Sequence, residues 1–366
     1  MGFRCGIVGL PNVGKSTLFN ALTETQAAQA ANYPFCTIEP NVGQVGVPDS
    51  RLDQIAKVAG SAKIIPTQLA FVDIAGLVKG ASKGEGLGNQ FLSNIREVDA
   101  IVHVLRCFED DDIQHVANKV DPLADAEVVE TELLMSDLES LEKRVPAAAK
   151  RATGGDKESK IAASVLGQAL ELLREGKPAR MTEPKDEEEE RVFKQAQLLT
   201  AKPVLYVCNV AEEDAANGNE LTAQVFAKAA GEGAQAVVVS AAIESELVSM
   251  EPEDRAEYLE SLGLEESGLA RVIRAGYELL DLKTFFTAGP KETRAWTFPN
   301  GAKAPQAAGE IHTDFERGFI RAETIAFDDY VGLGGESGAK EAGKLRQEGK
   351  EYVVQDGDVM LFKFNV

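Results

Sequence analysis

The feature that most constrains the fold is a glycine-rich octapeptide near the N-terminus. Residues 9–16 read Gly-Leu-Pro-Asn-Val-Gly-Lys-Ser and fit the pattern G-x-x-x-x-G-K-[ST] in full. An apolar run, Phe3–Leu10, leads into the motif, and a helical pattern, Thr17–Leu22, follows it. Such a loop binds phosphates, because its glycines let backbone N–H groups turn inward and the helix N-terminus adds positive potential. The octapeptide therefore predicts a P-loop nucleotide-binding domain of the α/β class.

Composition places the chain among large globular proteins. Its 366 residues are 44% hydrophobic and 27% charged, which is enough to bury a sizeable core and suggests two or three domains. No apolar run reaches the roughly 18 residues that span a bilayer, and the N-terminus lacks the regions of a signal peptide. We therefore expect a cytoplasmic protein with no membrane partner and with reduced cysteines.

The charge is strongly negative but unevenly distributed. The formal net charge of −21 argues against a protein that coats DNA or RNA by bulk charge. Most of the excess lies in residues 106–142 and 212–280, whereas residues 143–180 carry nine Lys and Arg against four Asp and Glu. This basic segment is either a local contact for RNA phosphates or an ordinary solvated helix surface.

Apolar, β-branched runs predict the strands of a parallel sheet. Segments with helical spacing separate these runs, and alternation of strand and helix is typical of a parallel sheet covered by helices on both faces. The predicted strands are Phe3–Leu10, Leu69–Ile74, Ala100–Phe108, Val204–Val210 and Ala236–Ser240.

Two departures from this alternation define the domain organisation. Within residues 127–199, two leucine-rich helical runs are joined by the turn Thr153–Asp156, which predicts an inserted helical hairpin of coiled-coil type. From residue 281 onward, short strand patterns alternate with Gly, Pro and Asn turns. We therefore predict a P-loop domain over 1–280, interrupted by the insertion at 127–199, and a small C-terminal domain over 281–366.

Polar residues around the loop predict a magnesium-assisted phosphate site. Lys15 is placed to reach the terminal phosphates, and the Ser16 hydroxyl is placed to coordinate Mg²⁺. Asp73 ends the second predicted strand and can hold Mg²⁺ through water, while the Gly76 N–H can reach a γ-phosphate. Thr37 lies between these motifs and can give Mg²⁺ a second hydroxyl.

Two further positions depart from the usual GTPase pattern. Leu77 stands where Ras-like enzymes use Gln to orient the attacking water, so intrinsic hydrolysis should be slow and should need another group, a cation or a partner. The guanine motif N-K-x-D is replaced by Asn209-Val210-Ala211-Glu212. Val210 cannot cover the ring as Lys does, and Glu212 is one methylene longer than Asp, so the site should discriminate poorly for guanine or favour adenine.

Long sequence runs resemble the YchF subfamily of Obg-like P-loop ATPases. The resemblance extends over the whole chain and is carried by Gly9–Thr17, Asn32–Asn41, Asp73–Asn89, Asn209–Glu212 and His312–Arg321. It implies a GTPase-type P-loop domain, an inserted coiled-coil hairpin and a C-terminal TGS domain of β-grasp type. It also implies a monomeric ATPase that prefers ATP to GTP, binds the ribosome through the hairpin and TGS domain, and regulates translation or a stress response as a nucleotide-controlled switch.

The resemblance also implies roles for individual residues. The phosphates would be held by Asn12, Val13, Gly14, Lys15, Ser16 and Thr17. The adenine would be held by Phe108, Asn209 and Val210, and Mg²⁺ by Ser16, Thr37 and, through water, Asp73. Asn12 resembles a P-loop Asn that binds K⁺ in potassium-stimulated relatives. Lys15 and His115 would be catalytic, with His115 replacing the missing Gln; Phe108 could equally be a core residue, and His115 a helix-surface residue.

Three functions remain open on the sequence alone. The leading one is an Mg²⁺-dependent ATPase switch on the ribosome. A non-catalytic, nucleotide-dependent adaptor is a second, because Leu77 favours weak turnover. A GTPase of ribosome assembly is a third, and the loss of N-K-x-D argues against it.

Overall fold

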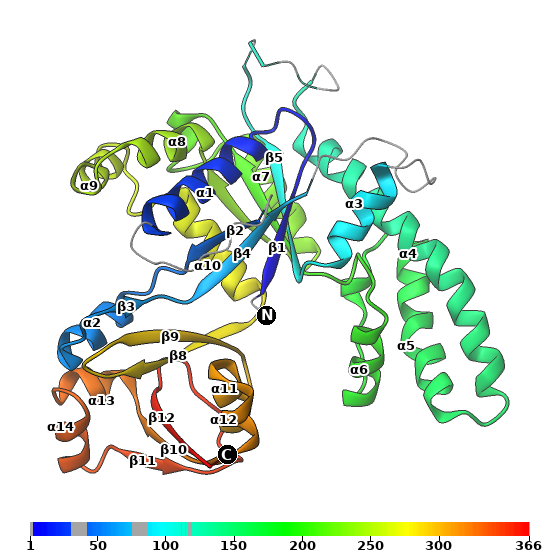
Figure 1. The fold of residues 1–366 in the computed structure, drawn as a ribbon. Coiled ribbons are helices and arrows are strands. Elements are labelled where there is room, and N and C mark those ends of the chain that lie inside the picture. The colour runs from blue at the N-terminus through cyan, green and yellow to red at the C-terminus, as the bar shows by residue number, and fades with distance from the viewer. Residues whose placement is uncertain are drawn as a thin grey trace. The chain divides into compact units, whose positions relative to one another are not determined.

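The computed structural model describes residues 3–30, 42–74, 87–110, 112–113, 115 and 119–365. These residues form two compact units: Met1–Gln44 with Ala70–Gly276, and Val45–Leu69 with Tyr277–Val366. Each unit contains a six-stranded sheet within the described ranges (Figure 1). The α/β fold class predicted from the sequence, a P-loop domain with a helical insertion and a small C-terminal domain, is confirmed.

The first unit is organised around the sheet that carries the P-loop. The strand order is β2-β4-β1-β5-β6-β7, and β1 pairs in parallel with both β4 and β5. The strands are β1 (Arg4–Val8), β2 (Val42–Gly46), β4 (Gln68–Asp73), β5 (Ala100–Arg106), β6 (Val204–Asn209) and β7 (Gln235–Val239). All five predicted strands are present, and every residue of β5 is buried, as expected for a parallel strand covered on both faces.

Helices flank this sheet on both sides (Figure 1). They are α1 (Lys15–Ala30), α3 (Leu87–Arg96), α7 (Glu220–Gly231), α8 (Ala241–Ser249), α9 (Pro252–Ser261) and α10 (Gly268–Leu279). The main core joins the strands to apolar residues of four helices, among them Ile95, Val129, Val225 and Ile243. None of the helices that the structure describes is long and apolar enough to cross a membrane.

The insertion folds as the predicted helical hairpin and adds a third helix. Figure 1 shows α4 (Pro122–Ala152) and α5 (Lys157–Arg174) side by side, with α6 (Glu187–Gln195) next to α5. A short 3-10 helix, η2 (Ala179–Met181), follows α5. The helices share a leucine- and alanine-rich core separate from that of the sheet. The acidic run that begins at Asp186 caps α6, since the Asp186 carboxylate accepts a hydrogen bond from the Glu189 N–H at 2.8 Å.

A buried carboxylate holds the end of the insertion against α4. Asp137 is 2% exposed and accepts hydrogen bonds from Leu199 N (3.0 Å), Thr200 N (2.8 Å) and Thr200 Oγ1 (2.7 Å). The same hydroxyl accepts from Ala179 N at 3.1 Å. These contacts satisfy backbone donors that would otherwise be buried without an acceptor, so Asp137 fixes the segment that leads into β6.

The second unit contains a mixed sheet in the order β11-β10-β12-β8-β9-β3. β8 and β9 form an antiparallel pair, β12 runs parallel to β8, and β10 runs antiparallel to β12. The strands are β3 (Ile64–Ile65), β8 (Leu282–Ala288), β9 (Thr293–Pro299), β10 (Phe319–Ile325), β11 (Arg346–Glu348) and β12 (Val359–Phe364). The helices are α2 (Ser50–Ala59), α11 (Ala304–Ile311), α12 (Thr313–Arg317), α13 (Phe327–Gly332) and α14 (Glu336–Glu341).

The boundary of this unit differs from the predicted 281–366. Residues 45–69, which the sequence interpretation assigned to the P-loop domain, belong to the same unit as the C-terminal strands. The reason is packing: Leu52 and Ile55 of α2 lie in one apolar core with Phe286, and β3 pairs in parallel with β9. Arg51 adds an ion pair to Asp356 at 2.8 Å. The amino-acid composition does not change at either end of residues 45–69, so the sequence does not indicate that they belong to the second unit.

We predict that Asp137→Ala lowers the free energy of unfolding by roughly 2–4 kcal/mol, because it leaves several buried donors without an acceptor. Urea titration of the full chain measures this. Glu139→Gln is the matched control on the same helix, since Glu139 is exposed and pairs only with Lys143 among the described residues. An Asp137→Ala midpoint equal to that of Glu139→Gln would contradict the role given to Asp137.

Candidate nucleotide site

The P-loop begins where β1 ends and has the backbone that its glycines predict. Asn12 and Gly14 have φ angles of +63° and +92°, in the left-handed region. Gly14 leaves no room for a side chain, because a Cβ at this position would collide with the amide of Asn209. The Gly14 carbonyl accepts a hydrogen bond from Leu18 N at 3.0 Å, which starts α1. The loop is therefore a preformed turn at a helix N-terminus, the geometry that accepts phosphate.

The structure brings the P-loop lysine to the predicted magnesium-site carboxylate. Asp73 ends β4, whose parallel register sets it opposite Ile7 of β1. Lys15 forms an ion pair with Asp73, and their side chains are 12% and 22% exposed. The side chains of Ser16 and Thr17 are exposed at the start of α1. Two strand ends and one helix start thus gather a cation, a carboxylate and hydroxyl groups.

This donor set fits Mg²⁺. A hydroxyl from Ser16 and a carboxylate from Asp73 are hard oxygen ligands, which Mg²⁺ prefers. No group of three or more His, Cys, Asp or Glu that could hold a metal occurs in the part of the chain that the structure describes. The protein would supply only part of the coordination sphere, as is usual for Mg²⁺ bound with phosphates and water. Thr37 and Gly76, also predicted here, lie outside the described residues.

Asn209 connects the P-loop to the loop that begins α8. Its Nδ2 donates to the Val13 carbonyl at 2.9 Å, and its Oδ1 accepts from Ala241 N at 2.9 Å. The residue is 5% exposed. Asn209 was predicted as an adenine contact. In the structure its side chain links the P-loop to the start of α8 by hydrogen bonds to both. Beside Ala241, the Ser240 hydroxyl is buried and has no partner among the described residues.

Phe108 follows the end of the strand that pairs with the Asn209 strand. At the ends of two parallel strands, Arg106 is opposite Asn209, and Cys107 N donates to the Asn209 carbonyl at 2.8 Å. The ring of Phe108 is half-buried, so it is not a fully enclosed core residue. Val210, by contrast, is 3% exposed and packs in the main core. The structure thus places Arg106 and Cys107, the residues before Phe108, against Asn209, and it buries the Val210 side chain in the protein interior.

Arg106 is the site residue that the sequence interpretation missed. It is 1% exposed, and its guanidinium carbon lies 4.7 Å from the centre of the Phe108 ring. Its N–H groups donate to three carbonyls of the following loop: Phe108 (3.0 Å), Asp110 (3.1 Å) and Ile113 (2.8 Å). The sequence did contain a signal for this role, since Arg106 is the charged residue that ends an otherwise apolar strand. A charged side chain in such a place is buried only where backbone carbonyls or carboxylates accept its hydrogen bonds.

His115 is buried, so the helix-surface interpretation of this residue is wrong. It is 6% exposed, and its Nε2 lies 2.8 Å from Oδ2 of Asp125 in the first turn of α4. Burial raises the pKa of the Asp125 carboxyl, while the hydrogen bond and charge of His115 act in the opposite direction. The pair joins the loop after β5 to the hairpin. The catalytic role of His115 stays a prediction.

Comparison with known proteins identifies the family. Residues 4–135 match a family model described as a 50S ribosome-binding GTPase, and residues 282–365 match the C-terminal YchF-GTPase model, described as a protein of unknown function. The chain is 58% identical to the ribosome-binding ATPase YchF of Haemophilus influenzae and 56% identical to that of Bacillus subtilis, over the full length of both chains.

Solved structures agree with this result. The YchF GTPase of Schizosaccharomyces pombe superposes with a TM-score of 0.88 at 38% identity, covering 99% of this chain and 98% of that one. A GTP-binding protein of Pyrococcus horikoshii matches at a TM-score of 0.61 and 21% identity, covering 99% and 100% of the two chains, which supports the fold alone. Full-length identity above 50%, together with the P-loop geometry, shows that this chain belongs to the YchF family of Obg-like P-loop proteins.

Proposed function

We propose that this chain is an Mg²⁺-dependent ATPase that prefers ATP to GTP and acts as a nucleotide-controlled switch on the ribosome. The observation that carries the base preference is the structure of the altered guanine motif. Val210 is buried in the core, and Glu212 lies exposed in a short 3-10 helix, η3 (Glu212–Asp214). The lysine that covers guanine and the aspartate that binds its edge are therefore both missing, whereas the half-buried ring of Phe108 follows the end of the strand that pairs with Asn209.

Each described residue has a specific task in this proposal. Backbone N–H groups of the P-loop and the Lys15 ammonium hold the phosphates. Asn209 keeps the P-loop in place through its hydrogen bond to the Val13 carbonyl. Ser16, and Asp73 through water, would hold Mg²⁺, which would neutralise charge that develops on the transferring phosphoryl group. Asn12 is exposed in a left-handed turn and is our candidate for a K⁺ contact. Phe108, whose ring is half-buried, is our candidate for the contact with the base.

The ribosome partner is supported by the names of the close relatives and by charge on the hairpin. Several hairpin cations are paired, for instance Lys143 with Glu139 and Lys177 with Glu175. Near the hairpin tip, Lys150, Arg151 and Lys160 are exposed, and no ion pair is formed by them with the described acidic residues. We propose that these three cations contact ribosomal RNA phosphates, and that the protein works as a cytoplasmic monomer.

Changing Lys15 to Ala should lower ATP hydrolysis by about 10²-fold or more, because the cation nearest the terminal phosphates is lost. Phosphate release measures hydrolysis, and ribosome co-sedimentation with ATP measures switch function in the same preparation. Lys57→Ala, an exposed residue of α2, is the control and should retain both. If ribosome binding with ATP survives in a Lys15 variant that binds ATP without hydrolysing it, and cellular function survives too, the adaptor function replaces the ATPase switch.

Changing Arg106 to Lys should raise the KM for ATP by roughly tenfold with a smaller change in kcat. Lysine keeps the charge, but its single nitrogen cannot reach the three carbonyls that Nε, Nη1 and Nη2 of arginine contact separately, so Phe108 loses its fixed position. Arg321→Lys, at an exposed position of β10, is the matched control. Steady-state kinetics with a parallel melting curve separate a base-site effect from unfolding, and an unchanged KM in a folded variant would exclude this role for Arg106.

Changing Lys150, Arg151 and Lys160 together to Gln should weaken ribosome co-sedimentation at least tenfold near physiological salt, since each lost phosphate contact reduces counterion release. The control replaces the same number of paired cations, Lys143, Arg174 and Lys177, with Gln. Ribosome-free ATP hydrolysis should be unchanged in both. Equal ribosome binding by the two triple variants would refute a phosphate-binding tip.

A further inference from the structure

The sheet of the first unit has an open edge along β7. β5 and β6, which precede β7 in the strand order, are buried throughout, whereas four of the five residues of β7 are only half-buried. The Val239 carbonyl accepts from Val210 N at 2.9 Å, and neighbouring residues of a strand direct their N–H and C=O groups to opposite sides. The N–H and C=O groups of Ala236 and Val238 therefore point away from β6, and no strand lies on that side in the part of the chain that the structure describes.

β7 lacks the features that usually protect the edge of a sheet. Such features are a very short strand, charged side chains, proline or a bulge. β7 reads Gln-Ala-Val-Val-Val and keeps one continuous register with β6. The edge strands of the second unit differ, since β3 has two residues and β11 has three, of which Arg346 and Glu348 are charged. An apolar, unpaired edge such as β7 is open to pairing with another chain.

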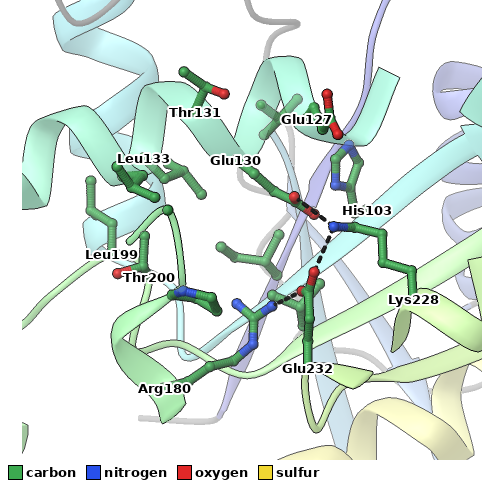
Figure 2. Close-up of a pocket in the computed structure, with 16 residues that line it drawn as sticks. His103, Glu127, Glu130, Thr131, Leu133, Arg180, Leu199, Thr200, Lys228 and Glu232 are labelled. Carbon is green, nitrogen blue, oxygen red and sulfur yellow. Dashed lines mark hydrogen bonds and ion pairs between the residues drawn. The ribbon is translucent and has the colours of Figure 1, made fainter. Parts of the chain in front are cut away.

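One flank of α7 adds apolar surface beside this edge. Lys228 of α7 faces α4, where it pairs with Glu130 at 2.9 Å (Figure 2). Phe226 lies about 200° around the helix from Lys228, so it is on the flank away from α4. Because α4 packs on β5 and the strand order is β5-β6-β7, that flank lies on the β7 side of the helix. It carries Ala223, Phe226 and Ala230, all exposed, with Phe226 43% exposed.

Two carboxylates lie near the C-terminal end of β7. The turn at Gly218 lies against Val238, and Glu220 follows it at the start of α7. The start of α10 at Gly268 lies against the same strand, and Glu265 precedes it. Both glutamates are exposed, and neither forms an ion pair with a cation of the described residues. This end of the edge is therefore negatively charged.

The charge distinguishes between two kinds of occupant for the edge. A second copy of the chain would bring like charge against like charge, since residues 212–280 carry fifteen Asp and Glu but only four Lys and Arg. A basic segment of another protein would instead pair its cations with the carboxylates. We propose that β7 accepts, as an added strand, an extended segment of a partner protein in which apolar residues alternate with Lys or Arg.

Each part of this surface has its own task in binding. The N–H and C=O groups of Ala236 and Val238 form the ladder, which a strand of any sequence can use. The exposed ring of Phe226 selects an apolar side chain, and Glu220 and Glu265 select cations. The interaction uses neither the P-loop nor the cations at the hairpin tip, so it is separate from the ATPase switch.

The test follows hydrogen exchange of single amides by NMR in the full chain, labelled with ¹⁵N-alanine and ¹⁵N-valine. The probe is the synthetic peptide acetyl-Lys-Val-Thr-Val-Lys-Val-Lys-amide. In the free chain, Ala236 and Val238 should exchange faster than Val237 and Val239, whose N–H groups pair with β6. Saturating peptide should slow exchange at Ala236 and Val238 by roughly tenfold or more, and high salt should weaken its binding.

Two further peptides separate the ladder from the charge. An analogue with proline in place of Thr and of the Val after it keeps the cations but cannot form the ladder, so it should protect neither amide. An analogue with Glu in place of every Lys keeps the ladder and should bind about tenfold more weakly or worse, because the carboxylates repel it.

Variants of the chain make the result specific. Val238→Pro removes an N–H that does not pair with β6, so the chain should fold with a melting temperature near that of the parent and should lose peptide binding. Phe226→Ala changes an exposed side chain, so folding should be unaffected, and peptide binding should weaken about fivefold.

The charge is tested by Glu220→Gln combined with Glu265→Gln, which should weaken peptide binding and reduce its dependence on salt. The matched control is Glu336→Gln combined with Glu341→Gln, at exposed positions of α14 in the second unit, and it should bind the peptide like the parent.

The proposal is overturned if the peptide leaves exchange at Ala236 and Val238 unchanged, if the proline analogue protects them equally, or if they exchange as slowly as Val237 in the free chain. Dimerisation of the free chain that Val238→Pro abolishes would assign the edge to a second copy and would also overturn it. Protection by oligouridylate in place of the peptide would assign the edge to RNA, with the same consequence.

Discussion

The two hydrogen bonds of the Asn209 amide are the interaction on which the nucleotide site depends. One holds the Val13 carbonyl of the P-loop and the other holds Ala241 N at the start of α8, so a single buried side chain joins the P-loop, the altered guanine motif and α8. The close approach of this amide leaves no room for a side chain at Gly14. The same contact therefore explains why the loop needs glycine there, and it gives Asn209 a structural role that does not require the Lys and Asp of the guanine motif.

The parallel register of the strands positions the other site residues around Asn209. β5 and β6 end side by side, so Arg106 lies opposite Asn209, and the buried guanidinium of Arg106 fixes Phe108 and the loop that leaves β5. β1 and β4 likewise end together, so Lys15 meets Asp73. Among the described residues, those proposed to hold the phosphates, the metal and the base come from separate segments, which meet where parallel strands of the sheet end.

Much of this arrangement could be predicted from the sequence, and the limits have physical causes. The P-loop, the five strands and the hairpin follow from glycine spacing and from apolar periodicity, which are local signals. Residues 45–69 belong to the second unit because Leu52 and Ile55 pack against residues more than 200 positions later in the sequence, such as Phe286. Local sequence signals do not report such contacts. Arg106 and Asp125 escaped prediction because their partners are backbone carbonyls and a histidine that the fold brings to them.

The central claim is that the altered Asn209–Glu212 motif, with Val210 buried, has replaced guanine recognition by adenine recognition. The most direct measurement is calorimetric titration of the unmodified chain with non-hydrolysable ATP and GTP analogues in the presence of Mg²⁺, repeated on a Val210→Lys, Glu212→Asp double variant that restores the N-K-x-D pattern. The account predicts tighter binding of the ATP analogue to the parent chain and a shift towards the GTP analogue in the variant. Tighter binding of the GTP analogue to the parent chain would contradict it.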